Sequence, residues 1–102
     1  MAHCPFEKLA DLRDLLDEIR ALPGIDEQKP GIFYLGRLAF LHFHIDKSGR
    51  RWADVRDGSE WGAELDLAIG ASKAAQARFA RDVKRRYQAC ARPKASAKKE
   101  RA

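Results

Sequence analysis

The stretch from Ile32 to Arg56, IFYLGRLAFLHFHIDKSGRRWADVR, decides the fold of this 102-residue chain. Its apolar and polar residues alternate, as they do in the strands of a sheet that is buried on one face. Gly36-Arg37 is typical of a two-residue hairpin turn, and the DKSG sequence at residues 46–49 is typical of a second hairpin. These turns predict an antiparallel meander that begins with strands at residues 32–35, 38–45 and 52–56.

The register between the second and third of these strands follows from the need to keep their apolar residues on one side. Leu41 should pair with Val55 and Phe43 with Ala53, because these four side chains then face the core together. By the same alternation, the opposite, outer face is expected to carry seven residues: Phe33, Phe40, His42, His44, Trp52, Asp54 and Arg56.

Helices are predicted before and after the sheet. Residues 5–22 and 72–91 carry apolar residues at spacings of three and four, which is the pattern of a helix with one buried side. Pro23-Gly24 ends the first helix, and Ser72 is a good N-cap for the second. The expected buried residues are Phe6, Leu9, Leu12, Leu16 and Ile19 in the first helix, and Ala75, Phe79, Val83, Tyr87 and Cys90 in the second. Residues 25–31 are interpreted as a polar connection.

A fourth strand is predicted from Trp61 to Ile69, where apolar residues alternate with Gly, Glu, Asp and Ala. A helix that starts at Ser59 is the competing interpretation, but it would scatter the apolar residues around its circumference. The predicted fold is therefore α+β: a two-layer sandwich in the order helix, four-stranded antiparallel meander, helix. Both helices should cover the same face of the sheet, because only one face is rich in aliphatic residues.

Charge is distributed unevenly along the chain. The net charge is +5 in total, but it is −4 over residues 1–72, +5 over residues 73–91 and +4 over residues 92–102. Residues 1–91 are expected to form a single α+β domain. Residues 92–102, RPKASAKKERA, lack an apolar anchor and are expected to form a disordered basic tail.

Several classes of protein are disfavoured by the composition. No apolar run approaches the ~20 residues of a membrane span, and the N-terminus lacks a signal-peptide pattern, so a cytoplasmic protein without membrane contact is expected. Cys4 and Cys90 are expected to be free thiols, the alternative being that they meet where the terminal helices run side by side. There is no Gly-rich phosphate loop, and no cofactor is expected.

The most specific chemical signal is a pair of histidines, His42 and His44. Imidazoles at i and i+2 of a strand project from one face, and with Asp54 or Asp46 they form a candidate three-ligand metal site. The alternative is that they are cross-strand partners, with His42 hydrogen-bonded to Asp54 and His44 stacked on Trp52.

A His–Asp pair also suits general acid–base chemistry, since the carboxylate fixes the imidazole tautomer. A nucleophile for such chemistry is missing, however. Ser48 and Ser59 lie in predicted turns, and the sequence contains no hydrolase motif around a Ser or a Cys. The sequence therefore favours a non-enzymatic module.

The aromatic residues of the outer face favour a binding surface. Phe33 is expected to pair with Phe40 there, beside Trp52, and exposed aromatics of this kind usually mark a contact with a protein partner or a second copy of the chain. The alternative is that these rings stack on nucleic acid bases while the basic tail contacts phosphates, which would give weak, non-specific binding. The carboxylate of Asp54 on the same face disfavours this alternative.

The sequence GIFYL, followed by FLHFH and then by ADVR at residues 53–56, resembles a group of small bacterial proteins of unassigned function that share an FLHFH…ADVR core. The resemblance covers roughly residues 5–90. It implies a free-standing bacterial domain, and it brings no catalytic residues with it.

Overall fold

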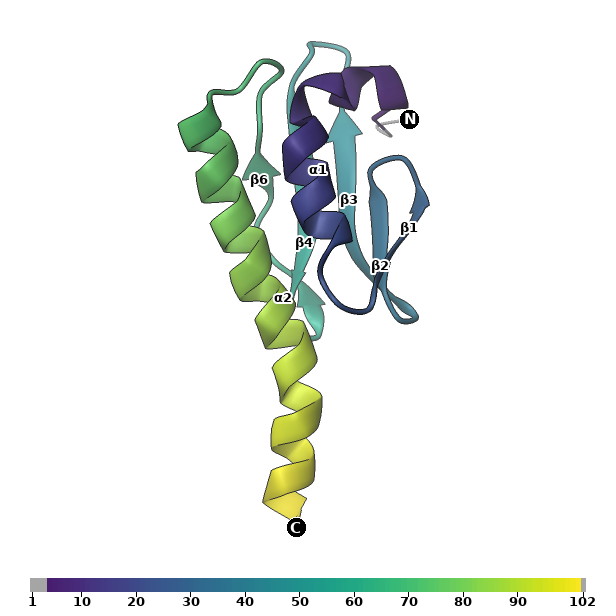
Figure 1. The fold of residues 1–102 in the computed structure, drawn as a ribbon, viewed down its shortest axis with the longest axis vertical. Helices are drawn as coiled ribbons and strands as arrows, with labels where there is room; N and C mark the ends of the chain where they lie inside the picture. Colours follow the sequence, from purple (N-terminus) through teal and green to yellow (C-terminus); the bar gives the residue numbers. More distant parts are fainter. Residues whose placement is uncertain (1–3, 102) are drawn as a thin grey trace.

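The computed structural model describes the backbone of residues 4–101 and the side chains of residues 4–91. Two helices cover one face of an antiparallel sheet, so the α+β prediction is confirmed (Figure 1). In chain order the elements are the 3-10 helix η1 (Phe6–Leu12), α1 (Arg13–Arg20), β1 (Ile25–Lys29), β2 (Ile32–Leu35), β3 (Leu38–Ile45), β4 (Arg51–Asp57), β5 (Glu60–Trp61), β6 (Leu65–Asp66) and α2 (Lys73–Arg101). None of the described helices combines the length and apolar character that crossing a bilayer requires.

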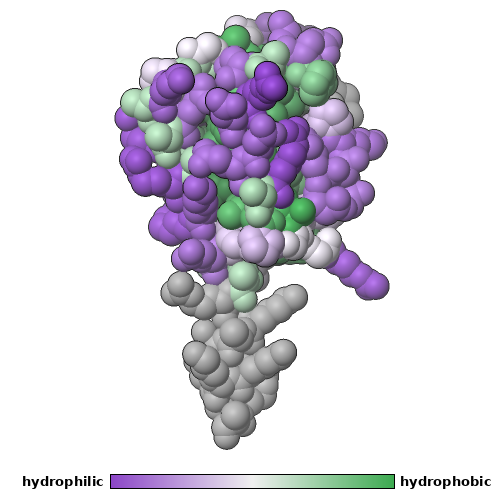
Figure 2. Space-filling model, in the orientation of Figure 1, coloured by the Kyte–Doolittle hydropathy of each residue, from purple (hydrophilic) through white to green (hydrophobic). Residues whose placement is uncertain are grey.

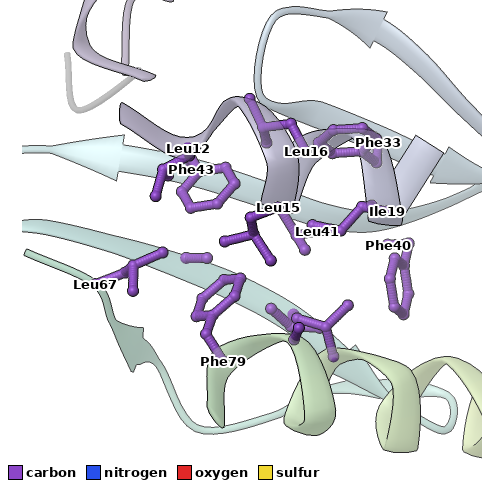
Figure 3. Close-up of a cluster of buried hydrophobic side chains, with 14 of the residues drawn as sticks. Leu12, Leu15, Leu16, Ile19, Phe33, Phe40, Leu41, Phe43, Leu67 and Phe79 are labelled. Carbon is purple, nitrogen blue, oxygen red and sulfur yellow. The ribbon is translucent and has the colours of Figure 1, made fainter. Parts of the chain in front are cut away.

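The central register of the sheet is the predicted one. Leu41 pairs with Val55 and Phe43 with Ala53, and all four side chains are buried beneath the helices. The Phe43 ring stacks on Phe79 of α2 with 5.6 Å between ring centroids (Figure 3). Because Leu12, Leu15, Leu16 and Ile19 from the N-terminal helices fill the same layer, one continuous core lies between the sheet and the helices.

Phe33 and Phe40 belong to this core, so their predicted place on the outer face is wrong. Phe33 pairs with Leu41, but Tyr34 pairs with Ala39, which leaves Phe40 as the extra residue of a β-bulge. The bulge breaks the alternation, and Phe40 and Leu41 are both buried on the helix side (Figure 3). Strict period-two alternation had placed these two neighbours on opposite faces.

The sheet has six strands rather than the predicted four. The polar segment 25–29, expected to be a connection, forms the edge strand β1 beside β2. The segment predicted as one strand from Trp61 to Ile69 does return along β4, but it pairs only at its two short pieces, β5 and β6. Between those pieces the buried guanidinium of Arg86 donates to the carbonyl oxygens of Val55 and Ala63, at 3.1 and 2.9 Å.

The helices also differ from the prediction at their ends. The first helix begins as 3-10 rather than α, and Phe6, expected in the buried stripe, is 64% exposed. Ser72 caps α2 as predicted, since its Oγ accepts from the Ala75 N–H at 3.1 Å. As a backbone element α2 continues to Arg101, so it does not end near Ala91. The disordered basic tail expected at residues 92–102 stays a prediction, because the side chains of these residues lie outside the described ones.

The two cysteines are free and lie in different surroundings. The Cys4 N–H donates to the Phe43 carbonyl at 3.3 Å, whereas the Cys90 thiol lies against the Gly58 carbonyl at 3.2 Å. Burial raises the pKa of both thiols. The alternative expectation from the sequence was that Cys4 and Cys90 meet, and they do not form a disulfide.

One ion pair, between the buried Arg51 and the partly exposed Asp11, joins three parts of the fold. Arg51, at the start of β4, binds the Asp11 carboxylate of η1 through two parallel contacts of 2.8 and 2.9 Å. Its other N–H groups donate to the carbonyl oxygens of Lys8, Leu67 and Ala68, each at 2.7 Å. All five guanidinium donors are thereby satisfied, which is the condition for burying this charge without a large penalty.

We predict that Asp11→Asn lowers the free energy of unfolding by about 2–3 kcal/mol, because it leaves the buried Arg51 without a counter-charge. The Arg51 hydrogen bonds hold the pKa of Asp11 below its ordinary value, so this stabilisation is present at neutral pH and is lost as the pH falls through that lowered pKa. Denaturant unfolding at pH 7 and at acid pH measures both effects.

The matched control is Asp17→Asn, which removes an exposed pair with Arg20 and should cost less than about 1 kcal/mol. Equal losses for the two variants would mean that the Asp11–Arg51 pair does not anchor the fold.

Candidate binding surface

The face of the sheet turned away from the helices is the candidate site. Five of the seven residues predicted for it are half-buried there: His42, His44, Trp52, Asp54 and Arg56. Phe33 and Phe40 are not on this face. Their place is taken by three residues that were not predicted there. Ile32 and Tyr34 of β2 flank the core-facing Phe33, and Trp61 of β5 pairs with Arg56.

A row of stacked side chains crosses β4 and β3. The Arg50 guanidinium lies 4.5 Å from the centre of the Trp52 ring, and the His44 ring stacks on Trp52 with 5.2 Å between centroids and 22° between planes. The His42 ring lies 4.2 Å from His44. The predicted contact between His44 and Trp52 is therefore confirmed, and it is part of a longer stack.

Asp54 contacts His44, the histidine that was predicted to stack on Trp52. Its backbone lies opposite His42 in the register, but Oδ2 reaches diagonally to His44 Nε2 at 2.9 Å. Both ring nitrogens of His44 are buried and make no hydrogen bond of good geometry, so this is a close polar contact rather than a hydrogen bond.

The predicted metal site at His42, His44 and Asp54 is not assembled. Among the described residues, no three His, Cys, Asp or Glu side chains converge as metal ligands. The two imidazole rings instead lie against each other, with 4.2 Å between centroids and 33° between planes.

Ion pairs and hydrogen bonds hold the two arginines of this face in place. Arg50 binds Glu64 at 2.8 Å and Asp66 at 2.6 Å, and these carboxylates raise the pKa of Arg50. Arg56 lies 4.3 Å from the Trp61 ring and donates to the Ala39 and Ser59 carbonyl oxygens. Each tryptophan is thus in contact with a fixed guanidinium, and the surface is preorganised.

An open hollow of about 590 Å³ adjoins the stack at β1 and β2. Ile32 and Tyr34 contribute its apolar and aromatic surface. Among the residues that the structure describes, Lys29 and Arg37 are its charged lining residues. The hollow therefore suits a side chain or segment that is partly apolar and carries negative charge.

Sequence reasoning missed Arg50 and Arg51, although the signal for both was present. Alternation along Arg50, Trp52 and Asp54 places Arg50 on the outer face, and alternation along Arg51, Ala53 and Val55 directs Arg51 into the core. A charged residue at an inward position indicates a buried ion pair.

We predict that Arg50→Ala shifts the fluorescence of Trp52 to longer wavelength, because the ring loses its guanidinium cover and becomes more exposed to water. The measurement needs a Trp61→Phe background, so that Trp52 is the only emitter. Arg37→Ala removes a cation that is not in contact with either tryptophan and should leave the spectrum unchanged. Identical spectra with and without Arg50 would show that the stack is not maintained in solution.

Comparison with known proteins gave no significant match to a family model, a curated protein or a solved structure. The resemblance to the FLHFH…ADVR group stays a prediction. Any functional conclusion must therefore come from the geometry of this chain.

Proposed function

We propose that this protein is a non-enzymatic binding module that associates with a second copy of itself through the outer face of the sheet. The observation that carries the proposal is the preorganised aromatic and histidine surface, which no helix of the described residues 4–101 covers. Aromatic residues and arginines are enriched at protein–protein interfaces, and fixed side chains lose little freedom when a partner binds.

The charges of this face support a second copy as the partner. One edge carries Lys29 and Arg37 beside the hollow against the single charge of Asp26. The other edge carries Glu64 and Asp66 against the single charge of Arg50. A two-fold axis along β3, the middle strand, would bring the basic edge of each copy against the acidic edge of the other. Closed two-fold dimers are the commonest oligomers, and they require this kind of self-complementary surface.

Stacking of nucleic acid bases on this face is the less supported alternative. Trp52 and Trp61 are each in contact with an arginine of the same chain, so their rings are already partly covered. Asp54, Glu64 and Asp66 would repel phosphates that approached the same surface. The absence of the two phenylalanines from the face removes further stacking surface.

The chain is expected to act in the cytoplasm of a bacterium. The free Cys4 and Cys90 suit a reducing compartment.

We predict that sedimentation equilibrium shows a concentration-dependent dimer. The substitution Ile32→Glu should raise the dissociation constant of this dimer at least tenfold. A tenfold change corresponds to about 1.4 kcal/mol, which is a modest loss for a charge placed within an interface. Ile32 lies opposite His42 and lines the hollow, so the new carboxylate would be desolvated on association.

Phe6→Glu is the matched control, because Phe6 is an exposed large apolar residue on η1, outside the sheet face. It introduces the same charge and should leave the dissociation constant within about twofold. A strict monomer at every concentration, or equal weakening by the two substitutions, would reject the proposal.

A further inference from the structure

The side of α2 that faces solvent is strongly basic. Every exposed residue between Lys73 and Ala91 on this helix is Lys, Arg, Gln or Ala. Arg78, Arg81 and Arg85 recur at spacings of three and four, so they lie along one side of the helix, opposite the buried Phe79, Val83 and Arg86. Figure 2 shows the surface along the described course of α2 as mainly hydrophilic.

Part of this charge is not neutralised within the fold. Lys84 pairs with Glu18 at 3.2 Å, and Arg85 pairs with Asp82 at 2.8 Å. Within the described part of the chain, neither Arg78 nor Arg81 forms an ion pair. Asp82 is the one acidic residue in the sequence from 73 to 91, so there is no other carboxylate on this stretch of helix for them.

The helix also extends the charge away from the domain. Its backbone continues past the sheet to Arg101 (Figure 1), and the sequence over residues 92–102 adds a net charge of +4. A helix of 29 residues is roughly 43 Å long, which exceeds one turn of B-DNA. Because residues 1–72 carry −4, an anionic partner is attracted to α2 and repelled by the rest of the domain.

We propose that the exposed side of α2 binds the phosphate backbone of double-stranded nucleic acid without reading its sequence. Arginine suits phosphate recognition because its planar guanidinium donates two parallel hydrogen bonds. The same side of the helix has no large apolar residue up to Ala91, so it cannot bury an apolar surface in a bilayer as membrane-bound amphipathic helices do. The nucleic acid site is thus on the helix layer, not on the sheet face.

The test is fluorescence anisotropy of a labelled DNA duplex of about 20 base pairs, titrated with the full chain at several salt concentrations. With Arg78, Arg81, Lys84 and Arg85 in contact with phosphates, the slope of log K against log salt should have a magnitude of at least about 3.6. Arg78→Glu with Arg81→Glu should weaken binding at least tenfold and reduce the slope by about 2.

The control is Lys8→Glu with Lys47→Glu, which makes the same change in net charge at two exposed lysines away from α2. This variant should bind the duplex within about threefold of the natural chain, and circular dichroism should confirm that both variants fold. Three results would overturn the proposal: no binding at 20 mM salt, equal weakening by both double variants, or binding to phosphatidylserine vesicles that exceeds binding to the duplex.

Discussion

The ion pair between the buried Arg51 and Asp11 is the interaction on which the rest of the structure depends. It connects η1, the first residue of β4 and the chain that leads from β6 to α2, three segments with little other reason to meet at one point. Asp11 also accepts from the Gly70 N–H at 2.9 Å, so the pair fixes the loop before α2. Successive side chains of a strand point to opposite faces, and the anchoring of Arg51 therefore also sets where Arg50 and Trp52 stand on the outer face.

A second buried arginine lies at the irregular edge of the sheet. Arg86 reaches from α2 between β4 and the returning chain, where its guanidinium donates to the carbonyl oxygens of Val55 and Ala63. Gly62 leaves room for it, since a Cβ there would lie 2.6 Å from Arg86 Nη1. The last predicted strand is divided into β5 and β6 at this place, and α2 is attached to the sheet by hydrogen bonds as well as by apolar contacts.

The two layers of the domain offer surfaces of different chemistry. The sheet face combines rings, histidines and charges of both signs held by neighbouring residues, which suits contact with a protein surface of similar composition. In the helix layer, the exposed side of α2 carries arginines and lysines, and Asp82 is the one acidic residue in the sequence from 73 to 91, which suits a polyanion. Since the two surfaces lie on opposite sides of the sheet, a dimer formed through the sheet faces would leave both α2 helices free to bind such a partner.

The sequence by itself determined the central part of the fold. Period-two alternation and the turn at residues 46–49 were sufficient for the pairing of Leu41 with Val55 and Phe43 with Ala53, and for the neighbouring contact between His44 and Trp52.

Only the tertiary structure decided the features that depart from strict alternation or depend on contacts between distant segments. A single extra residue at Phe40 moved both phenylalanines into the core, and the reach of Asp54 to the diagonal histidine depended on side-chain rotamers rather than on register. The polar β1 pairs because β2 offers it a free edge. Arg51 is buried because a carboxylate and carbonyl oxygens from distant segments satisfy it, and Arg86 donates to two distant carbonyl oxygens through Nη1. Such partners are far apart in the sequence, so no local pattern reveals them.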